Sequence, residues 1–164
     1  SKQWLMKKTV LIGTAILVLI GALGANCVII PVVPAGPEPV TVEITNLTGN
    51  QVQALLWSDP GLVDTPDDII LTPPYNLGPP LNPATDDTLA ETVTLTIECA
   101  DAGTLVADGN LILVPTGSIP SANILLLQEG RDFACGDTVS FFYEVAEDGT
   151  FFTSVNVNGV YLAP

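Results

Sequence analysis

The sequence TVSFFYEVAEDGTFFTSVNVN, residues 138–158, decides the fold of this protein. It consists of two runs of mainly β-branched and aromatic residues, 138–146 and 150–158, which are joined by Glu147-Asp148-Gly149. Such residues favour extended backbone, and Asp-Gly between two such runs is among the strongest hairpin signals in a sequence. The stretch therefore predicts an antiparallel β-hairpin.

Runs of the same kind recur in the chain after residue 39. Segments 40–47 and 51–58 alternate, or nearly alternate, between apolar and polar residues around the turn sequence Thr48-Gly49-Asn50. No segment after residue 40 has the apolar periodicity of a helix. Eight or nine short strands at this spacing predict an all-β domain over residues 40–164, an immunoglobulin-like two-sheet sandwich. The remaining strands are predicted over residues 68–72, 92–99, 104–108, 110–116 and 123–128.

One long segment between the predicted strands has no strand pattern. Residues 73–87, PPYNLGPPLNPATDD, are rich in proline and polar residues and predict a surface loop outside the core. A loop of this length within a compact domain is often functional. Either it contacts a neighbouring subunit through Tyr75, or it is a tolerated insertion.

The first part of the chain is apolar. Residues 9–37 contain no charged side chain, and three of the four basic residues, Lys2, Lys7 and Lys8, come just before them. A basic flank marks the cytoplasmic side of a membrane segment, so we expect the rest of the chain to be exported. A helix over residues 9–30 would be about 33 Å long, sufficient to cross a bilayer core of about 30 Å.

Three regions follow from this pattern. Residues 1–30 predict a basic flank and a hydrophobic helix that enters a membrane or an assembly. Residues 31–39 contain four prolines and predict an extended stalk, and residues 40–164 form the acidic sandwich. The apolar stretch Val28–Val33 either continues the membrane segment or adds a strand to the open sheet edge of a neighbour.

Two fates of the helix are open. Residues 6–27, MKKTVLIGTAILVLIGALGANC, resemble a bacterial lipoprotein signal peptide, which implies cleavage before Cys27 and lipidation of that cysteine. Asn26, however, stands where that family has a small residue. Alternatively the helix is retained, and the layout then resembles that of type IV pilins, whose N-terminal helices bundle. Small residues would let such helices pack closely: Gly13, Gly21 and Ala25.

The other two cysteines, Cys99 and Cys135, each lie next to a strand-like run. In an exported domain an even pair of cysteines usually forms a disulfide. We therefore predict a Cys99–Cys135 bond, worth about 4 kcal/mol on the chain-entropy model. The alternative is two separate buried thiols.

Charge and composition exclude several function classes. Residues 38–164 carry all 18 acidic residues and one basic residue, Arg131, for a net charge of −17. This charge repels phosphate backbones, so we expect no nucleic acid partner. It would attract cations or basic proteins, or it keeps an exposed surface soluble.

Few chemistries are left for catalysis. The chain has no histidine and no lysine after Lys8, which removes histidine-dependent triads, imidazole metal sites and Schiff-base chemistry. We therefore expect no enzyme activity. Trp57 is either a sugar platform or part of the core, and the second interpretation is favoured by its apolar strand. A structural calcium ion is the one cofactor left open, with these candidate ligands: Asp59, Asp64, Asp67 and Asp68.

These observations predict a non-enzymatic structural protein of the cell surface, membrane-attached or assembled through its N-terminal helix. Its expected partners are copies of itself or other proteins of an envelope complex. The alternative is a lipoprotein anchored through Cys27 that binds a cationic or carbohydrate ligand outside the cell. Residues 128–143, QEGRDFACGDTVSFFY, are similar to small secreted bacterial lipoproteins, a resemblance that implies a surface location and no particular activity.

Overall fold

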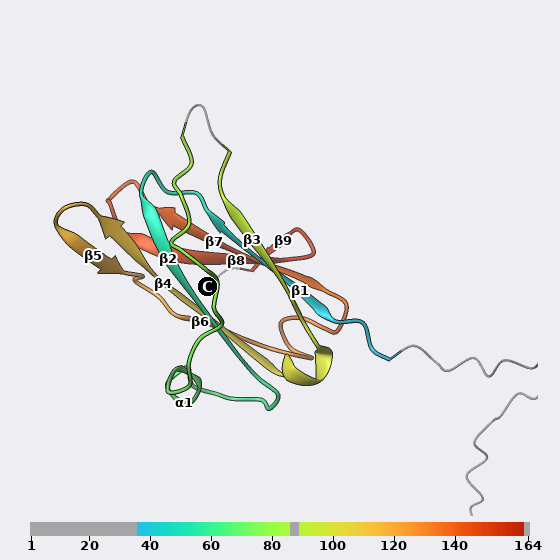
Figure 1. Ribbon diagram of the computed structural model, residues 1–164. Coiled ribbons are helices and arrows are strands. Elements are labelled where there is room, and N and C mark those ends of the chain that lie inside the picture. The colour runs from blue at the N-terminus through green and yellow to red at the C-terminus, as the bar shows by residue number, and fades with distance from the viewer. Residues whose placement is uncertain (1–35, 86–88, 163–164) are drawn as a thin grey trace, which may run out of the picture. The chain divides into compact units, whose positions relative to one another are not determined.

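The computed structural model describes residues 36–85 and 89–162, which form two β-sheets around one apolar core (Figure 1). This is the arrangement of a β-sandwich, and it confirms the predicted two-sheet β fold. The predicted N-terminal helix, with Gly13, Gly21, Ala25 and Cys27, lies outside the described residues. Among residues 36–85 and 89–162, no helix is long and apolar enough to cross a membrane.

The larger sheet has five strands in the order β3-β1-β7-β8-β9. Neighbouring strands are antiparallel except β1 and β7, which are parallel. The predicted hairpin is β7 and β8, and hydrogen bonds from Gly149 to Ala146 and from Ala146 to Thr150 close its turn. The strands are β1 (Val40–Asn46), β3 (Thr92–Ile97), β7 (Thr138–Val145), β8 (Phe151–Val157) and β9 (Val160–Leu162).

The smaller sheet has four strands with β4 at its centre. Strand β4 pairs with β2 along one side, and with β5 and then β6 along the other. The two short strands β5 and β6 therefore share one side of β4 and together take the place of a third full strand. The strands are β2 (Gln51–Asp59), β4 (Thr104–Leu113), β5 (Gly117–Pro120) and β6 (Leu125–Gln128).

Alternate residues of the central strands fill the space between the sheets. Strand β1 alternates strictly, with Val40, Val42 and Ile44 buried between partly exposed residues. Phe141 and Tyr143 of β7 are fully buried in the same cluster. Burying a side chain of this size stabilises the fold by roughly 1.5–3 kcal/mol. Hydrophobic packing in this cluster therefore holds the two sheets together.

The strand predicted over residues 68–72 is wrong. Residues 67–70 form the short helix α1 (Asp67–Ile70), of which only Ile69 is buried. Pro66 has a helical φ of −58°, and two aspartates occupy the first turn, where negative charge is favourable. A short apolar run is compatible with either helix or strand. Here Pro66 and the two aspartates before the run favour the helix.

Two further predictions on the strands are corrected. The segments predicted over 104–108 and 110–116 form a single strand, β4 (Thr104–Leu113), because Gly109 pairs with Ala54 without interrupting the ladder; residues 114–116 are instead the turn before β5, which was not predicted. Strand β9 was not predicted, although Asn158-Gly159 before it is a strong hairpin signal. Both residues have positive φ, 51° and 81°, as a two-residue hairpin turn requires.

The predicted disulfide is confirmed. Cys99 and Cys135 are bonded, with their Cα atoms 5.4 Å apart. Cys99 begins the short helix η1 (Cys99–Asp101) after β3, and Cys135 precedes β7. Since β3 and β7 flank β1, the bond fastens three neighbouring strands at one end of the larger sheet.

Candidate functional site

Strand β6 is an apolar edge strand of the smaller sheet. Within the described part of the chain it pairs only with β4. The N–H of Glu129 donates to the carbonyl of Gly103 (2.9 Å). Because backbone groups alternate in direction along a strand, Leu127 and Leu125 also face β4. The N–H and C=O of Leu126 therefore point to the open side, where a further strand can pair.

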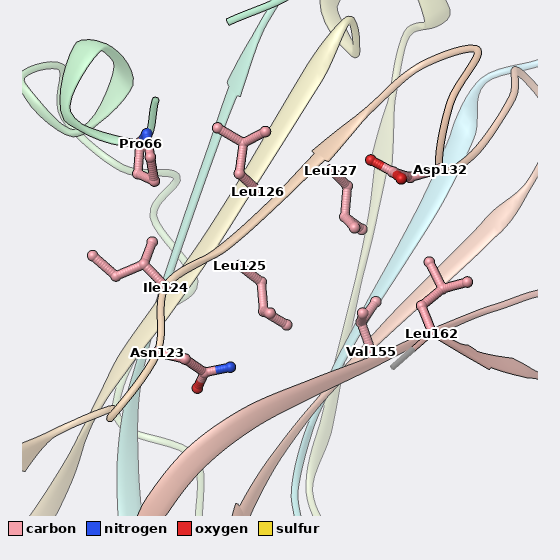
Figure 2. A pocket seen from close by; sticks show the side chains of 9 residues that line it. All are labelled: Pro66, Asn123, Ile124, Leu125, Leu126, Leu127, Asp132, Val155 and Leu162. Atoms are coloured by element: carbon pink, nitrogen blue, oxygen red, sulfur yellow. The ribbon is translucent and has the colours of Figure 1, made fainter. Parts of the chain in front are cut away.

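An apolar cleft of about 460 Å³ lies along this edge and reaches the larger sheet (Figure 2). Leu125 and Leu127 point from β6 toward Val155 of β8 and Leu162 of β9, whereas Leu126 points to the opposite face of its strand. Leu127 and Val155 are buried, and Leu125 and Leu162 are half-buried. The cleft is therefore a continuation of the core that opens to the surface.

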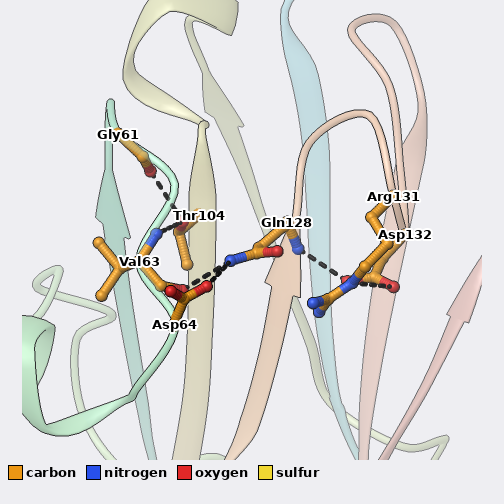
Figure 3. A network of polar contacts seen from close by, with 7 residues as sticks. All are labelled: Gly61, Val63, Asp64, Thr104, Gln128, Arg131 and Asp132. Atoms are coloured by element: carbon orange, nitrogen blue, oxygen red, sulfur yellow. Dashed lines mark hydrogen bonds and ion pairs between the residues drawn. The ribbon is translucent and has the colours of Figure 1, made fainter.

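A tight turn closes one end of the open edge (Figure 3). The carboxylate of Asp132 accepts a hydrogen bond from the Gln128 N–H (2.8 Å), and the N–H of Asp132 donates to the Gln128 carbonyl (2.9 Å). Both outward backbone groups of Gln128 are thus used within the chain. Arg131 forms an ion pair with Asp132 at 2.6 Å. Burial raises the pKa of Asp132, but the hydrogen bonds from Arg131 and Gln128 outweigh it and lower this pKa overall.

Asn123 closes the opposite end of the open edge, because its side chain makes the backbone hydrogen bonds to Thr153 that a neighbouring strand would make. Strand β9 pairs with residues 155–157 of β8 and does not reach Thr153. The Asn123 amide donates to the Thr153 carbonyl (2.8 Å) and its oxygen accepts from the Thr153 N–H (2.9 Å). The N–H of Ala122 donates to the Phe151 carbonyl (2.8 Å). The open edge is consequently limited to the residues between Asn123 and Gln128.

The Gln128 side chain anchors the loop between β2 and α1 (Figure 3). Its amide donates to the Val63 carbonyl (2.8 Å) and to the Asp64 carboxylate (3.4 Å). Thr104 of β4 accepts from the Val63 N–H (3.0 Å) and donates to the Gly61 carbonyl (2.8 Å). Both Gln128 and Thr104 are buried, so this network holds β6, β4 and the loop in fixed positions.

The edge of β2 is covered by the long segment that follows α1. Val52 and Leu81 exchange two backbone hydrogen bonds (3.0 and 2.8 Å), and the Tyr75 N–H donates to the Leu56 carbonyl (2.8 Å). Leu81 is 2% exposed and belongs to the core. The expectation that residues 73–87 lie entirely outside the core is therefore wrong, because this segment takes the place of a strand beside β2.

Asn46 holds the covering segment in place. Its buried amide nitrogen donates to the carbonyls of Asn50, Leu81 and Asn82 (2.9, 3.0 and 3.0 Å). Its oxygen accepts from both the N–H and the hydroxyl of Thr48 (2.9 and 2.8 Å). One side chain thereby satisfies backbone groups of two loops and fixes them together.

The edges of β3 and β5 are less suited to pairing with another chain. Strand β3 exposes alternate threonines and is flanked by Glu91 and Glu98, and charges at an edge oppose strand addition. Strand β5 contains Gly117 and Pro120, which weaken a strand. By contrast, residues 124–127 are an uninterrupted apolar run.

The four aspartates predicted as calcium ligands do not converge on one site. Asp59 accepts from the Gly61 N–H (2.7 Å) and Asp68 from the Thr65 hydroxyl (2.9 Å). Asp64 accepts from Gln128, as described above, and Asp67 is exposed in the first turn of α1. Within residues 36–85 and 89–162, no group of three or more metal-ligating side chains lies close enough together to hold a metal ion.

Trp57 and Tyr75, the two aromatic residues predicted as binding candidates, both make hydrogen bonds within the domain. Trp57 is 6% exposed and donates from its indole N–H to the Thr72 carbonyl (2.8 Å), so it belongs to the core. Tyr75 is partly exposed, with its hydroxyl hydrogen-bonded to Ser58 (2.7 Å). Neither ring lines the cleft.

The sequence matches no protein-family model and no curated protein. Fold and cleft together define a two-sheet β domain with an open apolar strand edge at β6. Chemically, this site can bind apolar side chains and pair with backbone. Sequence reasoning missed it, although the run Ile124–Leu127 was a usable signal: an exposed edge strand should alternate, and this one does not.

Proposed function

We propose that this chain is a non-enzymatic structural protein of the cell surface, which works as a subunit of a filament or an envelope complex. The observation that carries the proposal is the open edge of β6 with an apolar cleft beside it. Unpaired backbone groups next to apolar side chains are a template for pairing with another chain. If the N-terminal segments of several copies lie together, in a membrane or in the core of a filament, they bring a second chain close to this edge.

Fold and redox chemistry support an extracellular location. The described residues form nine strands in two sheets, the number found in the larger immunoglobulin-like sandwiches, and this architecture is shared by many cell-surface domains. The Cys99–Cys135 disulfide is of a kind that persists in oxidising compartments. We therefore propose an immunoglobulin-like domain, displayed outside the membrane that its N-terminal helix enters.

The distribution of charge favours contact through the cleft. Copies of the domain repel one another, because each carries a net charge of −17 over residues 38–164. This repulsion is screened beyond about 8 Å at physiological salt, so association needs a contact surface without unpaired charge. The cleft is such a surface, since its one carboxylate, Asp132, is paired with Arg131.

The alternative is a lipoprotein binding module anchored through Cys27. A carbohydrate or cationic ligand calls for aromatic rings or several carboxylates in a concave site. The cleft is lined by aliphatic side chains instead, and its carboxylate is already paired. Its chemistry therefore favours an apolar protein partner, while a lipid anchor at Cys27 would be compatible with either role.

Two measurements on the natively purified full chain test the proposal. Electron microscopy should show filaments or defined oligomers, and a population of small monodisperse particles would contradict it. The intact mass decides how the chain is attached. A mass of residues 27–164 plus acyl chains means lipidation at Cys27, whereas a mass that begins at or before Met6 means that the helix is retained.

A further inference from the structure

We propose that Val28–Val33 of a second copy of this chain adds as a strand to the open edge of β6 and fills the cleft between β6 and β9. The inference rests on the proposed function of an assembling subunit and deepens it by naming the two surfaces that meet. It assigns a role to the open apolar edge of β6 and to an apolar segment of the same chain.

The segment and the cleft match in chemistry. Val28–Val33 reads VIIPVV, five β-branched aliphatic residues and one proline, with no charge. The cleft is lined mainly by leucine, isoleucine and valine. β-Branched residues fit a pleated strand surface, and both partners would otherwise expose apolar groups to water. Main-chain bonds to Leu126 would give the added strand its direction, and its side chains would give it affinity.

Pro31 restricts the register of the added strand. Proline has no N–H, so on an added strand it must face away from the ladder. The backbone groups of Ile30 and Val32 then turn toward Leu126. In an antiparallel arrangement, residues whose backbone groups face each other lie opposite one another and share a face, so the side chains of Ile30 and Val32 lie on the same face as that of Leu126. The alternate residues, Ile29, Pro31 and Val33, then point into the cleft.

The course of the chain before β1 favours binding of Val28–Val33 to the cleft of another copy over binding to the cleft of its own chain. Residues 36–38, which lead into β1, are exposed. Strand β1 lies in the middle of the larger sheet, and β7 and β8 separate it from β9. To reach its own cleft, the chain would have to reverse direction within residues 34–39. Three prolines in that stretch, Pro34, Pro37 and Pro39, favour extended backbone instead.

The remaining apolar run is still long enough for the predicted membrane helix. If Val28–Val33 is a strand, residues 9–26 are left for the helix. That is 18 residues, within the range of roughly 17–25 that spans a bilayer. The added strand and the membrane segment are therefore compatible in one chain.

Photo-cross-linking of the full chain tests the contact. A benzophenone amino acid replaces Ile124, which is 39% exposed at the lip of the cleft, and, as a matched control, Ile119 of β5, which is 43% exposed. Equal amounts of ¹⁵N-labelled and unlabelled chain are mixed in detergent before assembly, then irradiated and digested. We expect position 124 to cross-link to the peptide that contains residues 28–33. Half of these pairs should join a labelled to an unlabelled chain, and position 119 should give none of them.

A pair of proline variants tests the register. In Val32→Pro the N–H that would pair with Leu126 is lost, so the yield of the cross-link should fall about tenfold. In Val33→Pro the lost N–H faces away from the ladder, so the yield should stay near that of the unmodified segment. Equal loss in both variants would overturn the proposed register.

The possible failures are distinguishable. Cross-links to residues 28–33 that always join chains of one isotope would overturn the second copy and show binding to the chain's own cleft. If the chain assembles but position 124 cross-links to another peptide or to none, Val28–Val33 is not the segment bound in the cleft. The proposed function would not be affected by that result. Chains that do not assemble at all would overturn the proposed function itself.

Discussion

Tyr143 of β7 lies against Gly109 of β4, so the two sheets meet where one strand has no side chain. A Cβ atom on Gly109 would stand 2.5 Å from Cε1 of Tyr143. The Tyr143 hydroxyl donates a hydrogen bond to the carbonyl of Asp108, the neighbour of Gly109. Burial raises the pKa of this phenol above its ordinary value, so it remains a hydrogen-bond donor throughout the neutral range.

This contact predicts that Gly109→Ala is destabilising. The added methyl group must displace a fully buried ring, and overpacking of a core typically costs about 1–3 kcal/mol of unfolding free energy. Urea denaturation measures the change. Gly49→Ala is the control, because a Cβ there meets nothing within 4 Å, and it should change stability by less than about 0.5 kcal/mol. Equal effects of the two substitutions would contradict the Tyr143 contact.

A second prediction concerns the segment that covers β2. Leu81→Ala should lower the unfolding free energy by about 2–5 kcal/mol, because it leaves a cavity in the core. Leu71→Ala, at a position that is 87% exposed, should have little effect. Both substitutions can be compared in the same denaturation series. If residues 73–85 were only a surface insertion, the two variants would be equally stable.

Asn46→Asp should be strongly destabilising. The substitution replaces an amide that donates to three carbonyls by a buried carboxylate that donates to none, and such losses cost at least about 1–3 kcal/mol. Asn76→Asp is the matched control, because Asn76 is exposed and uses only its oxygen, which accepts from the Gly78 N–H (3.1 Å). Thermal unfolding should separate them clearly, and similar melting temperatures would be the contrary result.

Two aspartates should respond to pH in opposite directions. Burial raises the pKa of Asp108, against a smaller lowering by the Gly109 N–H. Its ionisation therefore destabilises the fold at neutral pH, and this cost disappears as the pH falls through the folded pKa. We expect Asp108→Asn to be more stable than the wild-type protein at pH 7, and the two to converge below the ordinary carboxyl pKa of 3.8.

The control for this effect is Asp148, in the hairpin turn. A hydrogen bond from the Thr150 N–H (2.9 Å) lowers the pKa of its carboxyl group. The bond stabilises the fold above the unfolded pKa, and the contribution is lost as the pH falls through the folded pKa. Asp148→Asn should therefore be less stable than wild type at pH 7 and should converge with it in acid. Denaturation curves between pH 3 and 7 check both signs, and the same sign for both variants would contradict the assignment.

The parts of the fold that depend on local chemistry were predictable. Asp148-Gly149 indicated the β7–β8 hairpin, and the Cys99–Cys135 pair indicated the disulfide. Asn158-Gly159 carries the same kind of signal for β9, but the prediction ended with the strand over residues 150–158 and did not include β9. Leu81 could not be placed from sequence, because the Asn46 side chain that binds its carbonyl lies 35 positions earlier in the chain.

The candidate site was beyond prediction for a similar reason. Its lining combines β6, β8 and β9, which belong to two sheets, and the sequence does not say which strands meet. The apolar run Ile124–Leu127 indicated a strand, but not that one of its edges would be open. That property follows from β5 and β6 sharing one side of β4 and from Asn123 and Asp132 closing the two ends.

Sedimentation velocity of the full chain in detergent tests the central claim, that copies assemble through the open edge of β6. Three proteins are compared: the wild type, Ile124→Asp at the edge, and Ile119→Asp on β5 as a control of equal charge and similar exposure. All three retain the N-terminal segment, so unspecific association through it would be the same in each. We predict that the wild type and Ile119→Asp sediment as oligomers of the same size, whereas Ile124→Asp sediments as a smaller species. Oligomers of the same size in Ile124→Asp and Ile119→Asp would contradict the account.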